Sequence, residues 1–198
     1  MNVYQFDTVI VGSGASAFSA ADRLWSLGKT DLAIVTEHVN LGTSRNAGSD
    51  KQTYYKLTLS GGEPDSVMEM AETLFQGGCV DGDHALCEAA LSPRCFMRLV
   101  ELGVPFPCNR YGEYVGYKTD HDPRCRATSA GPYTSKMMTE ALEQSVRKRE
   151  IPILNRQQAI RILKLDECAA GLLCLDLEEA EKGAPDPYTA IQCRNIVW

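Results

Sequence analysis

The sequence lacks any long hydrophobic run. The longest apolar stretches in its 198 residues are far too short to cross a bilayer as a helix. Residues 1–7 also lack the basic start and the apolar segment of a secretory signal peptide. These absences argue against a membrane-spanning or secreted protein, and we expect a cytoplasmic location.

The sequence has fewer basic than acidic residues, and its cysteines form no metal-binding pattern. With 20 Lys and Arg against 26 Asp and Glu, the net charge is −6, which gives no electrostatic basis for binding nucleic acid or an anionic membrane. The eight cysteines include no C-x-x-C pair and no zinc-like spacing, so we expect no metal site. Without a secretory signal, these thiols are expected to be reduced and structural.

What the sequence does contain is typical of a globular protein. Hydrophobic residues make up 44% and charged residues 23% of the chain, and 198 residues suffice for one or two domains with a real core. There is no internal repeat and no low-complexity tract.

The most informative segment is residues 6–37, FDTVIVGSGASAFSAADRLWSLGKTDLAIVTE. The apolar run 8–11 predicts a buried strand, 15–27 predicts a helix, and 32–36 predicts a second strand. A G-x-G-x-x-A turn at 12–17 joins the first strand to the helix. This order predicts a β-α-β unit that binds a dinucleotide, whereas an ordinary Gly-rich turn does not account for the flanking pattern.

Each part of this unit has a physical task. Gly12 permits the tight turn, Gly14 lets a pyrophosphate approach the backbone, and Ala17 lets the helix pack closely on the strand. The helix N-terminus offers free N–H groups to the phosphates. Glu37 follows the second strand, where its carboxylate can accept hydrogen bonds from ribose hydroxyls. An acid here disfavours a 2′-phosphate, so NADP is the least expected dinucleotide.

A Gly-rich polar loop follows over residues 38–62. Its segment 42–50, GTSRNAGSD, is dense in small hydrogen-bonding residues. Loops of this length are usually functional or disordered. We expect this loop to wrap a flat polar ligand, because it leaves directly from the dinucleotide unit; a solvent-exposed loop with Asx and Ser turns is the alternative.

The remainder predicts helices and then strands. Helices are expected at about 65–77, with Asp65 as the N-cap, and at 83–102 and 134–149. Strands are expected at 151–154, at 159–166 and 171–178 joined by 167–170 as a β-meander, and at 188–198. Tyr111 to Tyr117 predicts a turn and a short strand.

The polar stretch 118–133 contains three candidates for function. His121 could act in acid–base chemistry, but a solvated loop histidine is the commoner case. Arg124 and Arg126 are expected to form salt bridges or to contact an anion rather than to carry out chemistry.

With these residues in place, the chain resembles the flavoprotein subunits of the fumarate reductase and succinate dehydrogenase family, a group of FAD-dependent oxidoreductases that includes L-aspartate oxidase. The resemblance rests on VIVGSGASAFSAADRL, IVTE and GTSRNAGSD. It implies an α/β fold, a Rossmann-like FAD/NAD-binding domain of three layers with a parallel central sheet and a β-meander.

The resemblance also implies an incomplete domain. The closing RNIVW is similar to the strand that in this family runs into an Ala-Thr-Gly-Gly turn, so the chain is expected to be the N-terminal portion of an FAD-binding domain. Its expected parts are a dinucleotide unit with a flavin loop (1–62), a helical insertion (63–150) and a strand and β-meander region (151–198). The capping domain, which carries the substrate-binding residues in the family, is expected to be absent.

Site residues follow from the same resemblance. The residues implied to bind the FAD pyrophosphate are Gly12, Ser13, Gly14, Ala15 and Ala17. Glu37 is implied to bind the adenosine ribose, and the backbone of Ala159 to contact adenine. The residues implied to lie along the flavin are Thr43, Ser44, Arg45 and Asn46. Several respiratory members attach FAD to a histidine at the position of Arg45, so FAD is expected to be non-covalent here.

The expected function is that of the FAD-binding portion of a flavin-dependent oxidoreductase. In the complete protein, hydride would pass between FAD and a small substrate, with dicarboxylates among the candidates, and an electron-transfer partner is a further expectation. The catalytic residues are unknown, and the chain alone is expected to show no turnover. The alternatives are a non-catalytic module that binds FAD or NAD, and a degraded product that binds neither.

Overall fold

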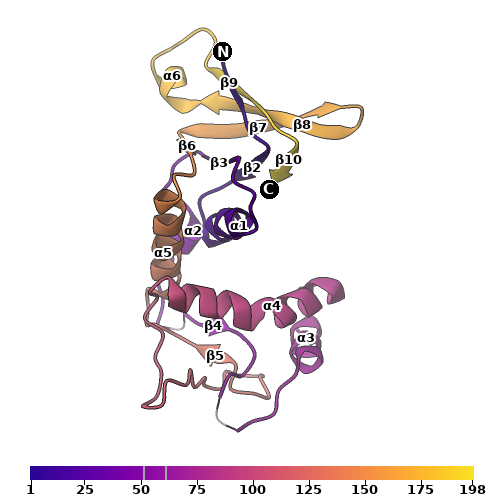
Figure 1. Ribbon diagram of the computed structural model, residues 1–198, viewed down its shortest axis with the longest axis vertical. Helices are drawn as coiled ribbons and strands as arrows, with labels where there is room; N and C mark the ends of the chain where they lie inside the picture. Colours follow the sequence, from indigo (N-terminus) through magenta and orange to yellow (C-terminus); the bar gives the residue numbers. More distant parts are fainter. Residues whose placement is uncertain (51, 61) are drawn as a thin grey trace. The chain divides into compact units, whose positions relative to one another are not determined.

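The computed structural model describes residues 1–50, 52–60 and 62–198; Lys51 and Gly61, which belong to the predicted Gly-rich loop, lie outside the described residues. The chain divides into two units, one formed by residues 1–47 and 139–198 and the other by residues 48–138 (Figure 1). Each unit has its own cluster of buried hydrophobic side chains.

A four-stranded parallel sheet in the order β10-β2-β3-β6 forms the centre of the first unit. Its strands are β2 (Thr8–Val11), β3 (Leu32–Thr36), β6 (Ile153–Asn155) and β10 (Asn195–Val197). Every residue of β3 is buried, as expected of a strand that is covered on both faces. The predicted parallel central sheet is confirmed.

A second sheet, in the order β1-β9-β8-β7, covers one face of the first. Its strands are β1 (Asn2–Gln5), β7 (Gln157–Leu165), β8 (Cys168–Asp176) and β9 (Tyr188–Gln192). Strands β7, β8 and β9 pair antiparallel, which confirms the β-meander. Leu172, Cys174 and Ile191 pack from this sheet against Val9 and Val35 of the parallel sheet.

Helix α1 (Ala15–Ser26) supplies the third layer and packs against β2 and β3 (Figure 1). Its buried face includes Ala17 and Phe18, and the small side chain of Ala17 suits close helix–sheet packing. The C-terminal part of α5 (Thr134–Lys148) is tied to α1 through Asp22, whose carboxylate accepts a hydrogen bond of 2.6 Å from the Ser145 hydroxyl. The expected three-layer α/β architecture is thus present.

Several expected strand boundaries were wrong. The meander connection is a two-residue turn at Asp166 and Glu167, whose φ angles of 49° and 64° fit a tight hairpin turn, and not the loop 167–170. The predicted strand 171–178 ends at Asp176, which caps the short helix α6 (Leu177–Glu181).

The ends of the chain also differ from expectation. The predicted strand 188–198 is two strands, β9 and β10, which belong to different sheets because the chain crosses between them at 193–194. Strand β1, which sequence analysis missed, pairs parallel with β9, and all four of its residues are exposed. Without a buried face, β1 has no hydrophobic alternation that could predict it.

The second unit contains helices α3 (Val67–Gln76) and α4 (Gly82–Glu101) and a short β4–β5 ladder. Strands β4 (Tyr54–Tyr55) and β5 (Ala127–Thr128) form this ladder. Helix α4 runs through Pro93. The N-cap of α3 is Ser66, whose hydroxyl accepts a hydrogen bond of 3.1 Å from the Glu69 amide, so the prediction of Asp65 as the N-cap was wrong.

Asp65 instead binds the buried side chain of Arg126. The Arg126 guanidinium is fully buried and donates to both carboxylate oxygens of Asp65, at 2.7 and 3.0 Å. A third contact of 3.2 Å joins it to Asp122. Arg124 pairs with Glu69 at 2.8 Å. Of the two alternatives expected for these arginines, salt bridges or contact with an anion, both residues form salt bridges.

Two further parts of this unit that the sequence singled out are residues 111–117 and His121. Tyr117 forms only an isolated bridge to Ala127, so the short strand expected within 111–117 was wrong. His121 is exposed in a turn. None of the described helices is long and apolar enough to cross a membrane.

Asp65 should make the second unit sensitive to acid. Burial raises the pKa of Asp65, but hydrogen bonds from Arg126 and from the amides of Thr58 and Ser66 lower it more, to about 2 from an ordinary value of 3.8. Because the folded-state pKa is the lower one, the stabilisation is complete above pH 3.8 and is lost as the pH falls toward 2.

We therefore predict that Asp65→Asn lowers the free energy of unfolding by about 2–3 kcal/mol at pH 7, because the buried guanidinium loses the carboxylate that binds it through both oxygens and keeps only the contact with Asp122 as a counter-charge. Urea unfolding followed by circular dichroism measures the change. Glu69→Gln, which breaks the partly exposed pair with Arg124, should cost less than about 1 kcal/mol. Equal losses in the two variants would contradict the assignment.

Candidate nucleotide-binding site

The Gly-rich turn leads from β2 into α1. Gly12 has a φ of +117°, a conformation that L side chains rarely adopt, so the exit from the strand requires glycine. Gly14 is the N-cap of α1 and has no side chain with which to cap the first turn. The amides of that turn and the positive end of the helix dipole are therefore suited to an anion.

Two hydroxyl groups fix the ends of the two central strands. The Thr36 hydroxyl donates to the Ser13 hydroxyl at 3.0 Å, and the Ser13 hydroxyl donates to the carbonyl of His38 at 3.1 Å. Both side chains are buried. This chain of hydrogen bonds holds the turn after β2 beside the start of the loop that follows β3.

That loop folds back onto the Gly-rich turn through α2 (Thr43–Asn46). The Ala15 amide donates to the Ser44 hydroxyl at 3.2 Å. A Cβ atom at Gly42 would lie 2.9 Å from the Ser13 carbonyl oxygen and 3.1 Å from the Gly14 Cα, so only glycine allows this approach. The Asn46 amide group donates to the carbonyls of Asn40 and Gly42 and closes the loop.

A cavity of about 290 Å³ opens beside these residues. Its walls include Gly12, Ser13, Glu37, His38, Gln157 and Ala159. Residues of the Gly-rich turn, the end of β3 and the start of β7 thus meet at one place, although they come from distant parts of the sequence. Sequence analysis named four of these six residues and missed His38 and Gln157.

Glu37 is exposed beside β7. Its Oε1 accepts a hydrogen bond of 3.1 Å from the Gln158 side chain, which orients the carboxylate. Gln158 lies 121 positions away in the sequence, and no local pattern could have paired the two residues.

The four expected flavin-loop residues take different positions. Ser44 contacts the turn, Asn46 closes the loop and Thr43 is exposed. The guanidinium of Arg45 is largely buried and forms ion pairs with Glu140, at 3.4 Å, and with Glu143 of α5. Its charge is therefore directed at α5.

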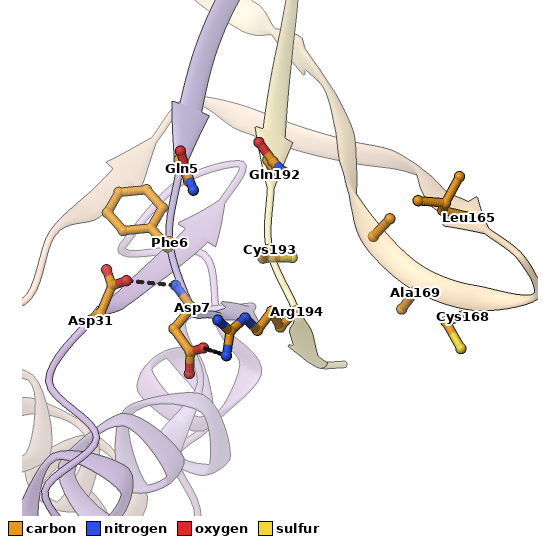
Figure 2. A pocket seen from close by; sticks show the side chains of 11 residues that line it. Gln5, Phe6, Asp7, Asp31, Leu165, Cys168, Ala169, Gln192, Cys193 and Arg194 are labelled. Carbon is orange, nitrogen blue, oxygen red and sulfur yellow. Dashed lines mark hydrogen bonds and ion pairs between the residues drawn. The ribbon is translucent and has the colours of Figure 1, made fainter.

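A second cavity, of about 350 Å³, lies where β2 and β3 begin rather than where they end (Figure 2). The Asp31 carboxylate accepts a hydrogen bond of 2.9 Å from the Asp7 amide, and the Asp7 carboxylate lies 3.7 Å from the Arg194 guanidinium. Cys168 and Cys193 also line the cavity, and burial raises the pKa of the Cys193 thiol. None of the predicted nucleotide-binding residues lies in this cavity.

Metal chemistry receives no support from the described residues. Within residues 1–50, 52–60 and 62–198, no group of three or more His, Cys, Asp or Glu side chains is placed to hold a metal ion.

Comparison with known proteins points to one family. The family described as "FAD binding domain" matches this chain over residues 7–192. No curated protein sequence matches the chain.

Solved structures share the fold. A mutant FrdA of E. coli quinol fumarate reductase superposes on this chain with a TM-score of 0.81 and 17% sequence identity; the match covers 99% of this chain and 32% of FrdA. Sdh1 of Mycobacterium smegmatis has a TM-score of 0.81 and 16% sequence identity, and the match covers 99% of this chain and 34% of Sdh1. The 3-ketosteroid-delta4-(5alpha)-dehydrogenase of Rhodococcus jostii RHA1 has a TM-score of 0.74 and 15% sequence identity, and the match covers 98% of this chain and 45% of the dehydrogenase. The chain thus spans from about a third to under half of the length of these proteins.

The close contact at Gly42 can be tested. We predict that Gly42→Ala lowers the free energy of unfolding by about 1–3 kcal/mol, because the added methyl group meets backbone atoms that cannot rotate away. The measurement is urea unfolding followed by circular dichroism.

Gly82→Ala is the matched control. A Cβ atom there meets only ring carbons of Phe75, at 3.8 and 3.9 Å, and the residue is helical, so the change should be neutral or slightly stabilising. If Gly42→Ala were as stable as this control, the loop would not lie on the turn as described.

Proposed function

This chain belongs to the FAD binding domain family, and from that premise we propose that it holds the adenosine diphosphate half of FAD in the cavity beside the Gly-rich turn. The observation that carries the proposal is the convergence of three features on one cavity: the glycine turn at Gly12, the carboxylate of Glu37 and the start of β7. A pyrophosphate, a ribose and a base require these features in that order.

Each residue has a task in this proposal. Gly14 leaves room for the pyrophosphate, and the amides of the first turn of α1 other than that of Ala15, which is bound to Ser44, donate hydrogen bonds to it. Glu37, oriented by Gln158, accepts hydrogen bonds from the ribose hydroxyls. Ser44 holds the flavin loop against the turn through the Ala15 amide. The backbone of Ala159 is proposed to contact adenine.

We further propose that FAD is bound non-covalently. A guanidinium forms no stable bond to flavin, and Arg45 is engaged by Glu140 and Glu143. Flavin bound to the chain should therefore be released into the supernatant when the protein is precipitated with acid. Flavin that stays with the precipitate would contradict this proposal.

For the complete protein, we propose an FAD-dependent oxidoreductase that acts in the cytoplasm. FAD, when bound, supplies the acceptor or donor of hydride, and the residues of this chain bind and orient it. The solved structures of similar fold are named for fumarate reductase, Sdh1 and a ketosteroid dehydrogenase, so they do not single out a substrate. We propose that a small substrate, and an electron-transfer partner, contact parts of the protein outside this chain, which alone shows no turnover.

A non-catalytic module that binds FAD or NAD is the second candidate. The residues of the cavity face features that the two dinucleotides share, because both contain adenosine diphosphate. Titration of the purified chain separates the candidates: preferential binding of FAD over NAD favours the first, and binding of NAD with no flavin response favours the second.

We predict that Gly14→Asp weakens FAD binding at least a hundredfold, because the new carboxylate meets the pyrophosphate at close range. Asp is a preferred N-cap residue, so the variant should fold at least as well as the parent. Quenching of flavin fluorescence on titration gives the dissociation constant.

Gly82→Asp is the control, since it places the same charge in the first turn of α4. It should leave FAD affinity unchanged. If Gly14→Asp bound FAD with unchanged affinity, the assignment of the pyrophosphate to this turn would be wrong.

A further inference from the structure

One polar atom in the cavity wall has no partner. Gln157 begins β7 and is only 8% exposed, and its Oε1 atom is buried and accepts no hydrogen bond from any of the described residues. A buried acceptor without a donor carries a free-energy cost that a ligand with a suitable donor would relieve. Gln157 shares the cavity with Gly12 and Glu37.

The other arm of this amide is already committed. Gln157 faces Asp176 across the β7–β8 ladder, and its side chain donates a hydrogen bond to that carboxylate. Asp176 is itself fixed as the N-cap of α6, where it accepts from the amides of Glu178 and Glu179 at 3.1 Å each. A carboxylate only accepts, so a flipped Gln157 amide would place two oxygens together.

This anchoring fixes which atom remains for a ligand. With Nε2 held by Asp176, Oε1 is the arm of the amide left without a partner. Gln157 lines the cavity, so a donor on a ligand bound there can serve Oε1 while Nε2 stays on Asp176. The site therefore offers a hydrogen-bond acceptor to a donor.

The order of groups along the ligand identifies that donor. Phosphates donate no hydrogen bonds, and the proposed function assigns the ribose hydroxyls to Glu37. The base is next along the ligand, and the same proposal assigns it to the start of β7, where Gln157 and Ala159 line the cavity. The exocyclic amino group is the hydrogen-bond donor of adenine, whereas hypoxanthine carries a carbonyl oxygen at the same place.

We propose that Gln157 selects adenine by accepting a hydrogen bond from its amino group through Oε1. The proposal rests on the proposed function, because it takes the occupant of the cavity to be an adenine dinucleotide. It adds a specificity-determining side chain that lies outside the Gly-rich motif and whose role depends on its partner in β8.

The test compares two ligands on the 198-residue chain: FAD and its analogue with hypoxanthine in place of adenine. Flavin fluorescence quenching gives both dissociation constants. The parent chain should bind FAD about tenfold more tightly than the analogue, since a carbonyl oxygen would face Oε1. In Gln157→Met, which keeps the length but not the acceptor, the ratio should fall to about one. ADP and IDP, used as competitors, should give the same ratio.

Two further variants protect the test against effects on folding. Thr189 lies in the same sheet, and its buried hydroxyl oxygen also has no hydrogen-bond partner among the described residues, but Thr189 is not part of the cavity wall. In Thr189→Val, the preference for FAD over the analogue should therefore persist. In Asp176→Asn, two facing amides can pair reciprocally and satisfy Oε1 within the protein, so the preference should fall although Gln157 is present.

The outcomes separate this proposal from the function on which it rests. Equal affinity of the parent chain for the two flavin nucleotides would overturn the role of Gln157 and leave FAD binding intact. An undiminished preference in a folded Gln157→Met, or in Asp176→Asn, would overturn it too. Failure of the parent chain to bind either nucleotide would overturn the proposed function itself.

Discussion

The parallel pairing of β2 with β3 is the constraint on which the site depends. Because both strands run in the same direction, the turn at Gly12 and the acid at Glu37 emerge at the same edge of the sheet. The hydrogen bond between Thr36 and Ser13 then fixes the two exits relative to each other. The rest of the cavity wall, including Gly42 before α2 and the start of β7, lies beside this pair of strand ends.

The parts of this arrangement that are local in sequence could be predicted. The strand, turn and helix of residues 8–26 are predicted by their hydrophobic runs and glycine spacing, because each is stabilised by neighbours within a few positions. Strand β1 could not be found, since it is exposed and depends on β9, almost 190 residues later.

The side chains that complete the site could not be predicted either, because their positions depend on contacts between distant parts of the sequence. Gln157 and Gln158 look like ordinary polar residues in a strand, and only the fold places them at the cavity and beside Glu37. Gly42 was one glycine among several in a loop, and its need for glycine arises from contact with the Gly-rich turn. Likewise, the sequence predicted ion pairs for Arg126, but it did not predict that Asp65, expected to cap a helix, would be the partner of Arg126.

The ion pairs of Arg45 have a consequence for how such a protein could acquire a covalently tethered cofactor. A histidine at this position would remove the largely buried guanidinium that binds Glu140 and Glu143 of α5, and would leave Glu143 with the more exposed Arg147 as its cation. The change would thus demand a compensating substitution in a helix nearly a hundred residues away. Under the non-covalent binding proposed above, tethering would therefore require coupled alterations in two elements of this chain rather than one substitution.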